Sequence, residues 1–154
     1  MDQKRNKLFI VLAGIFITNA LLAEIIGVKI FSFESTLGVN PAQLQILGFT
    51  MDFNLTAGVI LWPVVFITTD LINEYFGKPG VRFISYLTAA LISFSFIMLF
   101  FTIQLPPAEW WLDANNKDQS GNAFNIDFAF SKIVGQGQRI IIGSLVAFLA
   151  AQLI

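Results

Sequence analysis

The sequence predicts an all-α integral membrane protein with about four transmembrane helices, on the basis of three observations. Apolar residues make up 56% of the 154 residues, whereas charged residues make up 12%, about half the ~25% typical of globular domains. Phe occurs 17 times, more often than Lys and Arg together, which occur 9 times. Four stretches are long and apolar enough to supply the roughly 20 residues that a helix needs to cross a bilayer. A soluble domain of this size could not hide so much apolar surface from water.

The four predicted spans cover residues 8–30, 55–76, 81–105 and 129–154. The first span follows Lys4, Arg5 and Lys7, as the apolar segment of a signal peptide would. Its apolar run is too long for a signal peptide and no cleavage site of small residues follows it, so we interpret it as a retained span. Between the second and third spans, residues 77–80 have the Gly-Lys-Pro-Gly composition of a tight turn.

Two longer connections separate the other spans. Residues 31–54 combine polar residues with the apolar run 44–49, a pattern that fits either a short interfacial helix or a re-entrant segment. Residues 106–127 form a polar loop, and Trp110 and Trp111 lie in it where an interfacial aromatic belt is expected.

The basic residues predict the orientation of the chain in its membrane. Five of the nine Lys and Arg residues fall on one side if the spans alternate: Lys4, Arg5, Lys7, Lys78 and Arg82. Cytoplasmic loops carry an excess of such residues, so we expect a cytoplasmic N-terminus. The last span reaches Ile154 without a polar or basic flank. We therefore expect residues 1–154 to be a single membrane domain that is truncated at its C-terminus.

The residue types that are absent exclude several kinds of chemistry. The chain has no Cys and no His, which excludes disulfide frameworks, thiol catalysis, Cys/His zinc sites and Ser-His-Asp triads. The net charge is −1 and no basic block follows the N-terminus, so nucleic acid is not an expected partner. The spans offer carboxylates but no nucleophile–base pair and no metal-ligand set. We expect no enzyme activity, no metal site and no cofactor.

The densest group of polar residues inside a predicted span is Asp70, Asn73 and Glu74. Asp70 and Glu74 are four residues apart and share one helix face, with Asn73 beside them. A charge at the centre of a membrane helix costs about 2.5–3.5 kcal/mol, so such residues are candidates for function. This group suits binding of a ligand rich in N–H donors, or coupling to a proton or cation. The structural alternative is that Asn73 and Glu74 mark the cytoplasmic interface and that Asp70 pairs with a cation.

Three further residues complete the candidate substrate site. Arg139 lies on a stripe of small residues in the fourth span and is the natural counter-charge for Asp70 or Glu74; a structural ion pair and a ligand role both fit it. Asn19 lies in the middle of the first span, so it needs a hydrogen-bond partner in the bundle. Trp62 precedes Pro63, and a proline inside a helix favours a kink. The Trp62 ring could stack on a planar ligand. The third span carries a phenylalanine face that we expect to face lipid or the core, with ligand stacking as the less favoured alternative: Phe94, Phe96, Phe100 and Phe101.

Residues 58–77 read GVILWPVVFITTDLINEYFG and are followed by Arg82. This segment resembles the signature of the queuosine precursor transporter family, which belongs to the vitamin uptake transporter group. Thr18-Asn19 with Lys29-Ile30, and Gln138-Arg139-Ile140 with residues 144–153, are also similar to that family. The resemblance implies an inner-membrane importer of 7-deazaguanine precursors of the modified tRNA nucleoside queuosine. It also implies a bundle of typically six helices, of which this chain would hold four.

Two other functions remain open at this point. One is a substrate-binding membrane subunit for another vitamin-like molecule that works with an energising module. The other is a structural membrane protein without a ligand. For the importer we expect the lipid bilayer and a 7-deazaguanine-like small molecule as partners, and a homo-oligomer or an energising module as further candidates.

Overall fold

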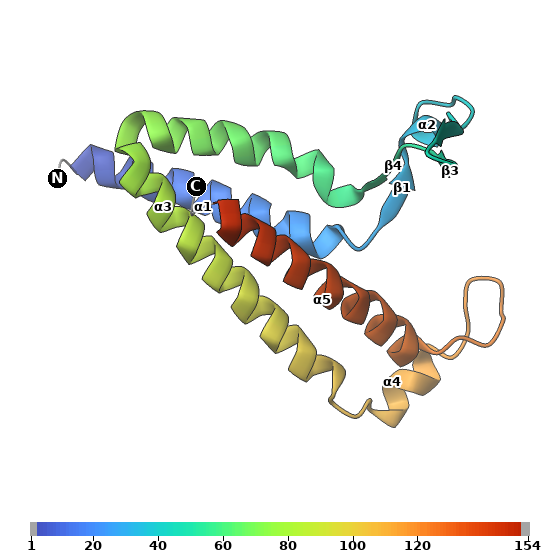
Figure 1. The fold of residues 1–154 in the computed structure, drawn as a ribbon. Coiled ribbons are helices and arrows are strands. Elements are labelled where there is room, and N and C mark those ends of the chain that lie inside the picture. The colour runs from blue at the N-terminus through green and yellow to red at the C-terminus, as the bar shows by residue number, and fades with distance from the viewer. Residues whose placement is uncertain (1–2, 152–154) are drawn as a thin grey trace. The chain divides into compact units, whose positions relative to one another are not determined.

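The computed structural model describes residues 3–151, and the chain is mostly helical (Figure 1). Within this range, the side chains of residues 138, 139, 145 and 147–151 lie outside the description. The helices are α1 (Gln3–Ile26), α2 (Phe33–Thr36), the 3₁₀ helix η1 (Ala57–Leu61), α3 (Trp62–Ile103), α4 (Glu109–Ala114) and α5 (Ile126–Ala151). The strands are β1 (Ile30–Ser32), β2 (Leu44–Ile46), β3 (Phe49–Met51) and β4 (Asn54–Thr56). The chain divides into two compact units, residues 1–85 and 86–154, each of which is described by itself.

Two helical stretches of the described chain are long and apolar enough to cross a membrane, Gln3–Ile26 and Ala57–Ile103. The 24 residues of α1 span about 36 Å at 1.5 Å per residue, more than the ~30 Å hydrocarbon core. The described chain is thus mostly helical, as predicted, and these two stretches are candidate membrane spans. That the chain crosses the membrane four times stays a prediction. The first helix begins earlier and ends earlier than the predicted span 8–30, because the chain turns after Ile26 and then enters β1.

The second stretch is divided at Gly77, as the predicted turn requires. Gly77 has φ 67° and ψ −175°, a conformation that glycine adopts without the steric penalty of a Cβ atom. It separates a first segment of α3, residues 62–76, from a second segment, residues 78–103, and the chain reverses direction there (Figure 1). Gly80 is also required in the turn, since a Cβ atom on it would lie 2.6 Å from Cβ of Phe76.

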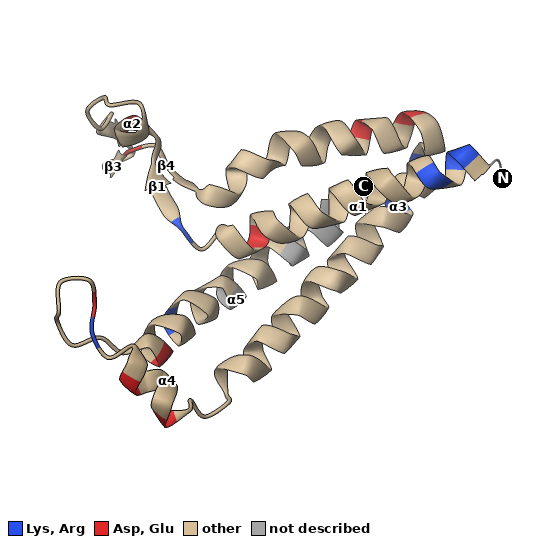
Figure 2. Cartoon of the chain, turned by 180° about the vertical axis from the view of Figure 1, so that it is seen from behind, with Lys and Arg blue, Asp and Glu red and all other residues tan. Residues whose placement is uncertain are grey.

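Arg5 closes the end of the first segment of α3. Its Nη2 donates a hydrogen bond to the Tyr75 carbonyl oxygen at 3.0 Å, and its guanidinium lies 5.4 Å from the centre of the Phe76 ring. The last carbonyls of a helix lack partners within the helix, and a cation there also complements the helix dipole. Figure 2 shows the basic residues at the N-terminal end of α1. One residue of the predicted cytoplasmic basic group therefore also caps a helix.

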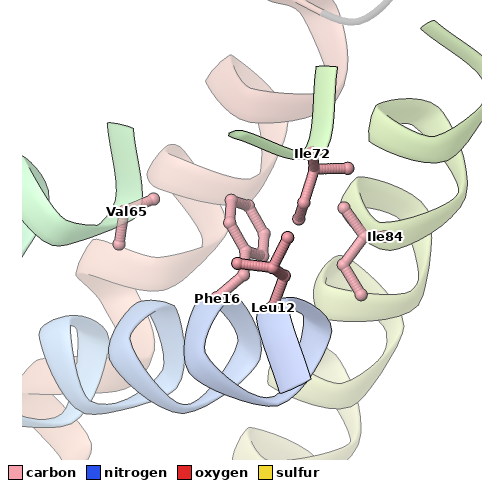
Figure 3. Packing of buried hydrophobic residues seen from close by; sticks show 5 residues of the cluster. All are labelled: Leu12, Phe16, Val65, Ile72 and Ile84. Carbon is pink, nitrogen blue, oxygen red and sulfur yellow. The ribbon is translucent and has the colours of Figure 1, made fainter. Parts of the chain in front are cut away.

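The core of the first unit joins α1 to both segments of α3. Its buried residues are Leu12 and Phe16 from α1 and Val65, Ile72 and Ile84 from α3 (Figure 3). Aromatic packing extends this core toward the turn at Gly77, where the rings of Phe9 and Phe76 meet edge to face at 4.9 Å. Such packing matters in lipid, because helices there associate through close contact rather than through exclusion of water.

A short antiparallel ribbon of β1 and β4 holds the C-terminal end of α1 next to the N-terminal end of η1. Ile30 pairs with Thr56, and the Ala57 N–H donates to the Lys29 carbonyl at 2.8 Å. Next to this ribbon, Gly58 is buried against the backbone of Ala23 in α1. A Cβ atom on Gly58 would collide with the Ala23 carbonyl oxygen. The sequence places a glycine at this close approach of the two backbones.

Residues 31–54 contain one helical turn and are otherwise strands and turns, so the apolar run 44–49 does not form the short interfacial helix that the sequence left open. A re-entrant path of this segment through the membrane stays a prediction. The ribbon β1–β4 leads through the single turn α2 into a second hairpin, in which β2 pairs with β3. The apolar run 44–49, which suggested a membrane segment, supplies most of this hairpin. Short apolar runs fit strands and helices equally well. Here Leu47 and Gly48 both have positive φ, as in the two-residue turn of a β-hairpin, so the residues on either side form strands.

The second unit contains a structured polar loop between α4 and α5. The Asp118 carboxylate accepts hydrogen bonds from the backbone N–H groups of Ser120 and Asn122, at 2.9 and 2.8 Å. These bonds lower the pKa of Asp118, with the Asn122 N–H as the largest cause. Helix α5 starts after Asn125, whose Oδ1 accepts from the Phe128 N–H at 2.9 Å as an N-cap.

We predict that Gly58→Ala lowers the melting temperature of the protein in detergent. The added methyl group must displace the α1 backbone at Ala23, and overpacking of this kind costs about 1–3 kcal/mol. The matched control is Gly14→Ala, because Gly14 lies in α1 with nothing within 4 Å of its Cβ position. Alanine is the better helix former, so the control should melt at the same or a higher temperature. Equal melting temperatures for both variants would contradict the close packing at Gly58.

Candidate functional site

The first segment of α3 presents one face that carries four of the six predicted site residues. Its opposite face, with Val65, Thr68 and Ile72, is buried in the first unit. The exposed face carries, in order along the helix, Trp62, Phe66, Asp70, Asn73 and Glu74. Residues three and four apart are neighbours on a helix, so these side chains form a continuous stripe. Figure 2 shows the acidic residues on this segment of α3.

The stripe is aromatic at one end and acidic at the other. The rings of Trp62 and Phe66 lie 5.6 Å apart between centroids and are tilted by 32°. Asp70 is one turn beyond Phe66, about 6 Å along the axis, whereas Trp62 is two turns away, about 12 Å. Side chains on a helix lean toward its N-terminus, so the Asp70 carboxylate lies over the turn that carries Phe66. By helical spacing, the aromatic residue one turn from Asp70 is therefore Phe66, which was not among the predicted site residues.

The carboxylates of this face keep their acceptor capacity. The hydroxyls of Thr68 and Thr69 donate back to the Val64 and Val65 carbonyls, at 2.7 and 2.8 Å, and so do not serve Asp70. Within the described chain, the side chains of Asp70, Asn73 and Glu74 form no hydrogen bond or ion pair. A carboxylate in this state can accept two N–H groups of a ligand side by side. In a membrane helix, such a group is expected to face protein, water or a ligand rather than lipid.

Asn19 has found a partner in its own helix. Its Nδ2 donates to the Ile15 carbonyl at 2.8 Å, and the side chain is half-buried in α1. This bond satisfies one of the two amide donors without any neighbouring helix, so the need for an interhelical partner is weaker than the sequence implied. Asn19 and Asp70 are not joined by a hydrogen bond in the described chain.

Arg139 lies in α5, but its side chain is outside the described residues. Helix α5 belongs to the second unit, whereas Asp70 belongs to the first. The predicted pairing of Arg139 with Asp70 or Glu74 stays a prediction.

Described residues of the second unit line at least two cavities. The larger, of about 290 Å³, is an apolar groove lined by Ser93, Phe96, Ile97, Phe100, Phe101, Ile141 and Ile142. The Ser93 hydroxyl donates to the Ala89 carbonyl at 2.8 Å, so the groove can pack rings or chains but presents no free hydroxyl donor. The smaller, of about 240 Å³, is lined by Thr102, Leu105, Pro106, Pro107, Trp111, Asp127 and Phe130. Three of the four phenylalanines of the predicted third-span face line the first of these cavities or lie beside it.

Glu34 is the polar residue whose importance the sequence analysis missed. Its side chain is 5% exposed and its carboxylate accepts from the Phe53 N–H at 2.8 Å, the Ser32 hydroxyl at 3.1 Å and the Ala42 N–H at 3.3 Å. These bonds hold the pKa of Glu34 below its ordinary value, with the Phe53 N–H as the largest cause. One signal in the sequence was available, since Glu34 is the sole charged residue between Lys29 and Asp52.

Comparison with known proteins identifies a family for most of the chain. The model of the family described as "Putative vitamin uptake transporter" matches residues 56–154. The match begins at the last residue of β4 and includes the whole of α3 and its exposed face. No curated protein and no solved structure matches the chain.

We predict that Glu34→Gln loosens residues 31–56 at neutral pH. The Ala42 and Phe53 N–H groups both donate to Oε1 of Glu34, and the Ser32 hydroxyl donates to Oε2. Glutamine keeps one oxygen for the two N–H groups but removes its charge, which weakens both bonds, and it places an amide NH₂ where Ser32 now finds an acceptor. Hydrogen exchange measured by mass spectrometry should become faster in peptides that cover residues 42–53. The matched control is Glu109→Gln, an exposed residue of α4, which should leave these peptides unchanged.

The same bonds predict a pH dependence. Because the folded chain lowers the pKa of Glu34, the carboxylate stabilises the loop fully above the ordinary value near 4.5 and loses this effect as the pH falls through the lower folded value. Limited proteolysis of the loop with an acid-active protease should therefore accelerate below about pH 4.5 more in the wild type than in Glu34→Gln. An equal acceleration in both proteins would show that another group controls the loop.

Proposed function

Because the chain belongs to the vitamin uptake transporter family, we propose that it imports queuosine precursors, the 7-deazaguanine bases used for salvage in tRNA modification, across the bacterial inner membrane. The family and the two long apolar helices support a membrane protein with a transport role rather than an enzymatic one. The observation that carries the substrate proposal is the exposed face of α3, on which a free carboxylate lies one turn from an aromatic ring.

The chemistry of a 7-deazaguanine fits this face. The guanine edge offers adjacent N–H donors, and a single carboxylate such as that of Asp70 can accept both. The planar ring would stack on Phe66, and Trp62 would support Phe66 from the far side through their tilted contact. Asn73 and Glu74 lie one turn further and would bind the polar groups that distinguish one precursor from another. Arg139 would neutralise Asp70 in the absence of substrate.

We further propose four spans in this chain, with the N-terminus in the cytoplasm, as part of a bundle of six helices. The turn at Gly77 and its basic residues would lie on the cytoplasmic side, together with Arg5 and the start of α1. The ribbon β1–β4 and the loop around Asp118 would lie on the opposite side.

This topology predicts opposite labelling of two introduced cysteines. The chain has no Cys of its own, so Ser120→Cys and Lys78→Cys each create a unique thiol. In intact cells, a membrane-impermeant maleimide should modify the thiol at position 120, whereas the thiol at position 78 should react only after the membrane is opened. Modification of both from the same side would refute the four-span topology.

We predict that Asp70→Asn in the full-length gene reduces uptake of labelled queuosine precursors by about 5- to 150-fold, the equivalent of about 1–3 kcal/mol for an unsatisfied donor pair. Asparagine keeps one acceptor but turns a donor toward the donors of the ligand. The control is Asp113→Asn, an exposed residue of α4, which should transport normally.

The double variant Asp70→Asn/Arg139→Gln separates binding from charge pairing. If Asp70 only pairs with Arg139, removal of both charges should restore expression and uptake together. We expect expression to recover and uptake to stay low, because the acceptor of the guanine edge is still missing. Wild-type uptake by Asp70→Asn alone would remove Asp70 from the substrate site.

A further inference from the structure

The hairpin β2–β3 contains no charged residue. Residues 39–51 include no Asp, Glu, Lys or Arg. The charges that flank this segment are engaged at the base of the hairpin. Glu34 accepts from the Phe53 and Ala42 N–H groups, and Oδ1 of Asp52 accepts from the Gln43 N–H at 2.8 Å. The hairpin therefore projects an uncharged segment of chain from a base that fixes its position.

One face of the hairpin is entirely apolar. In the register of the two strands, Leu44 pairs with Met51 and Ile46 pairs with Phe49. Side chains alternate between the two faces of a strand, so these four residues share one face. All four are exposed, from 43% for Leu44 to 73% for Phe49.

The opposite face of the hairpin is polar and already satisfied. Gln45 pairs with Thr50, and Nε2 of Gln45 donates to the Thr50 hydroxyl at 2.8 Å. The hairpin is thus amphipathic across its two faces, and its polar side makes its own hydrogen bond. An isolated two-stranded hairpin of this kind is only marginally stable in water, so its apolar face is expected to have a partner.

The tip of the hairpin carries the most exposed large apolar residue of the described chain. Leu47 is 94% exposed and has φ 51°, followed by Gly48 with φ 83°. Two positive φ values in succession are typical of a type I′ turn, whose first position favours Asn or Asp rather than a large apolar side chain. A leucine held in this conformation and pointed away from the protein is unfavourable in water, which indicates a different surrounding for the tip.

The hairpin is tethered close to the surface of the bilayer. Its base is the ribbon β1–β4, which starts within four residues of the end of α1 at Ile26 and runs directly into η1 at Ala57. The three residue pairs of that ribbon extend about 10 Å. The headgroup layer reaches about 5–7 Å beyond the hydrocarbon core on each side. A hairpin whose own strands are about 10 Å long can reach back to this layer.

We propose that the hairpin β2–β3 is a membrane-interface anchor, whose apolar face and Leu47 insert into the boundary between lipid headgroups and acyl chains. The membrane face concerned is the one opposite the end of α1 that carries Arg5. A lipid surface fits this face better than a protein partner does, because a protein interface carries a polar rim and this face offers no charge and no unpaired polar side chain. The absence of charge also means that binding does not depend on anionic lipids. The anchor rests on the membrane location of the chain and not on the identity of its substrate.

The test uses the full chain reconstituted into phosphatidylcholine vesicles, with a polarity-sensitive fluorophore on a single introduced cysteine. A label on Leu47→Cys should be quenched strongly by lipids that carry a nitroxide at a shallow position of the acyl chain. The control label on Ser120→Cys lies in the polar loop around Asp118, on the same predicted side of the membrane, and should be quenched several-fold less. Equal quenching at the two positions would overturn the proposal.

Two further measurements keep the test decisive. In Leu47→Asn, the Asn-Gly pair suits the type I′ turn, so the hairpin should keep its hydrogen-exchange protection. Quenching of a label on Phe49→Cys should fall when this substitution is present, because the apolar tip has been lost. A label at position 47 that is shielded in vesicles yet not quenched by nitroxide lipids would report a contact with protein, including a second copy of the chain, and would refute the lipid anchor. Uptake activity plays no part in any of these readouts.

Discussion

Gly58 contacts the backbone of α1 at Ala23, and this contact fixes where α3 starts relative to α1. Any side chain at Gly58 would push the two elements apart, since nothing flexible lies between them. The ribbon β1–β4 secures the same junction through its backbone pairs, and Arg5 closes the other end of the helix pair at the Tyr75 carbonyl. With both ends held, the rotation of α3 about its axis is set, and Val65 and Ile72 face the core formed with Leu12 and Phe16.

The exposed face of α3 follows from that rotation. Once Val65, Thr68 and Ile72 are inside, helical periodicity leaves Phe66, Asp70 and Glu74 on the other side. The threonines next to Asp70 are satisfied by the helix itself, so the carboxylate keeps its acceptor capacity for something outside this unit. A membrane helix tolerates such a residue where it serves binding or pairing, and the family match covers this whole segment. The packing that stabilises the first unit therefore also leaves the candidate site exposed on the other face of α3.

In the connection of residues 31–54, the buried carboxylate of Glu34 holds the loop together through its hydrogen bonds. Glu34 binds N–H groups from Ala42 and Phe53 and thereby gathers the strands on either side of it. Glu34 and Asp52 are both engaged at the base, and the hairpin β2–β3 above them contains no charged residue. An element of this composition beside an apolar helix pair is suited to the membrane interface rather than to bulk water. The loop is consequently an ordered extension of the membrane unit.

The sequence by itself determined the membrane character, the break at Gly77 and the position of Asp70, Asn73 and Glu74 on one helix face, because these depend on composition and on local periodicity. Only the tertiary structure decided that residues 31–54 form two ribbons, since Glu34 and Phe53 are 19 residues apart and no local pattern encodes their hydrogen bond. It also decided that the rings of Trp62 and Phe66 pack against each other, and that Asn19 is bonded to the Ile15 carbonyl of its own helix. These outcomes depend on how backbones approach and which donors find acceptors, which periodicity in the sequence does not specify.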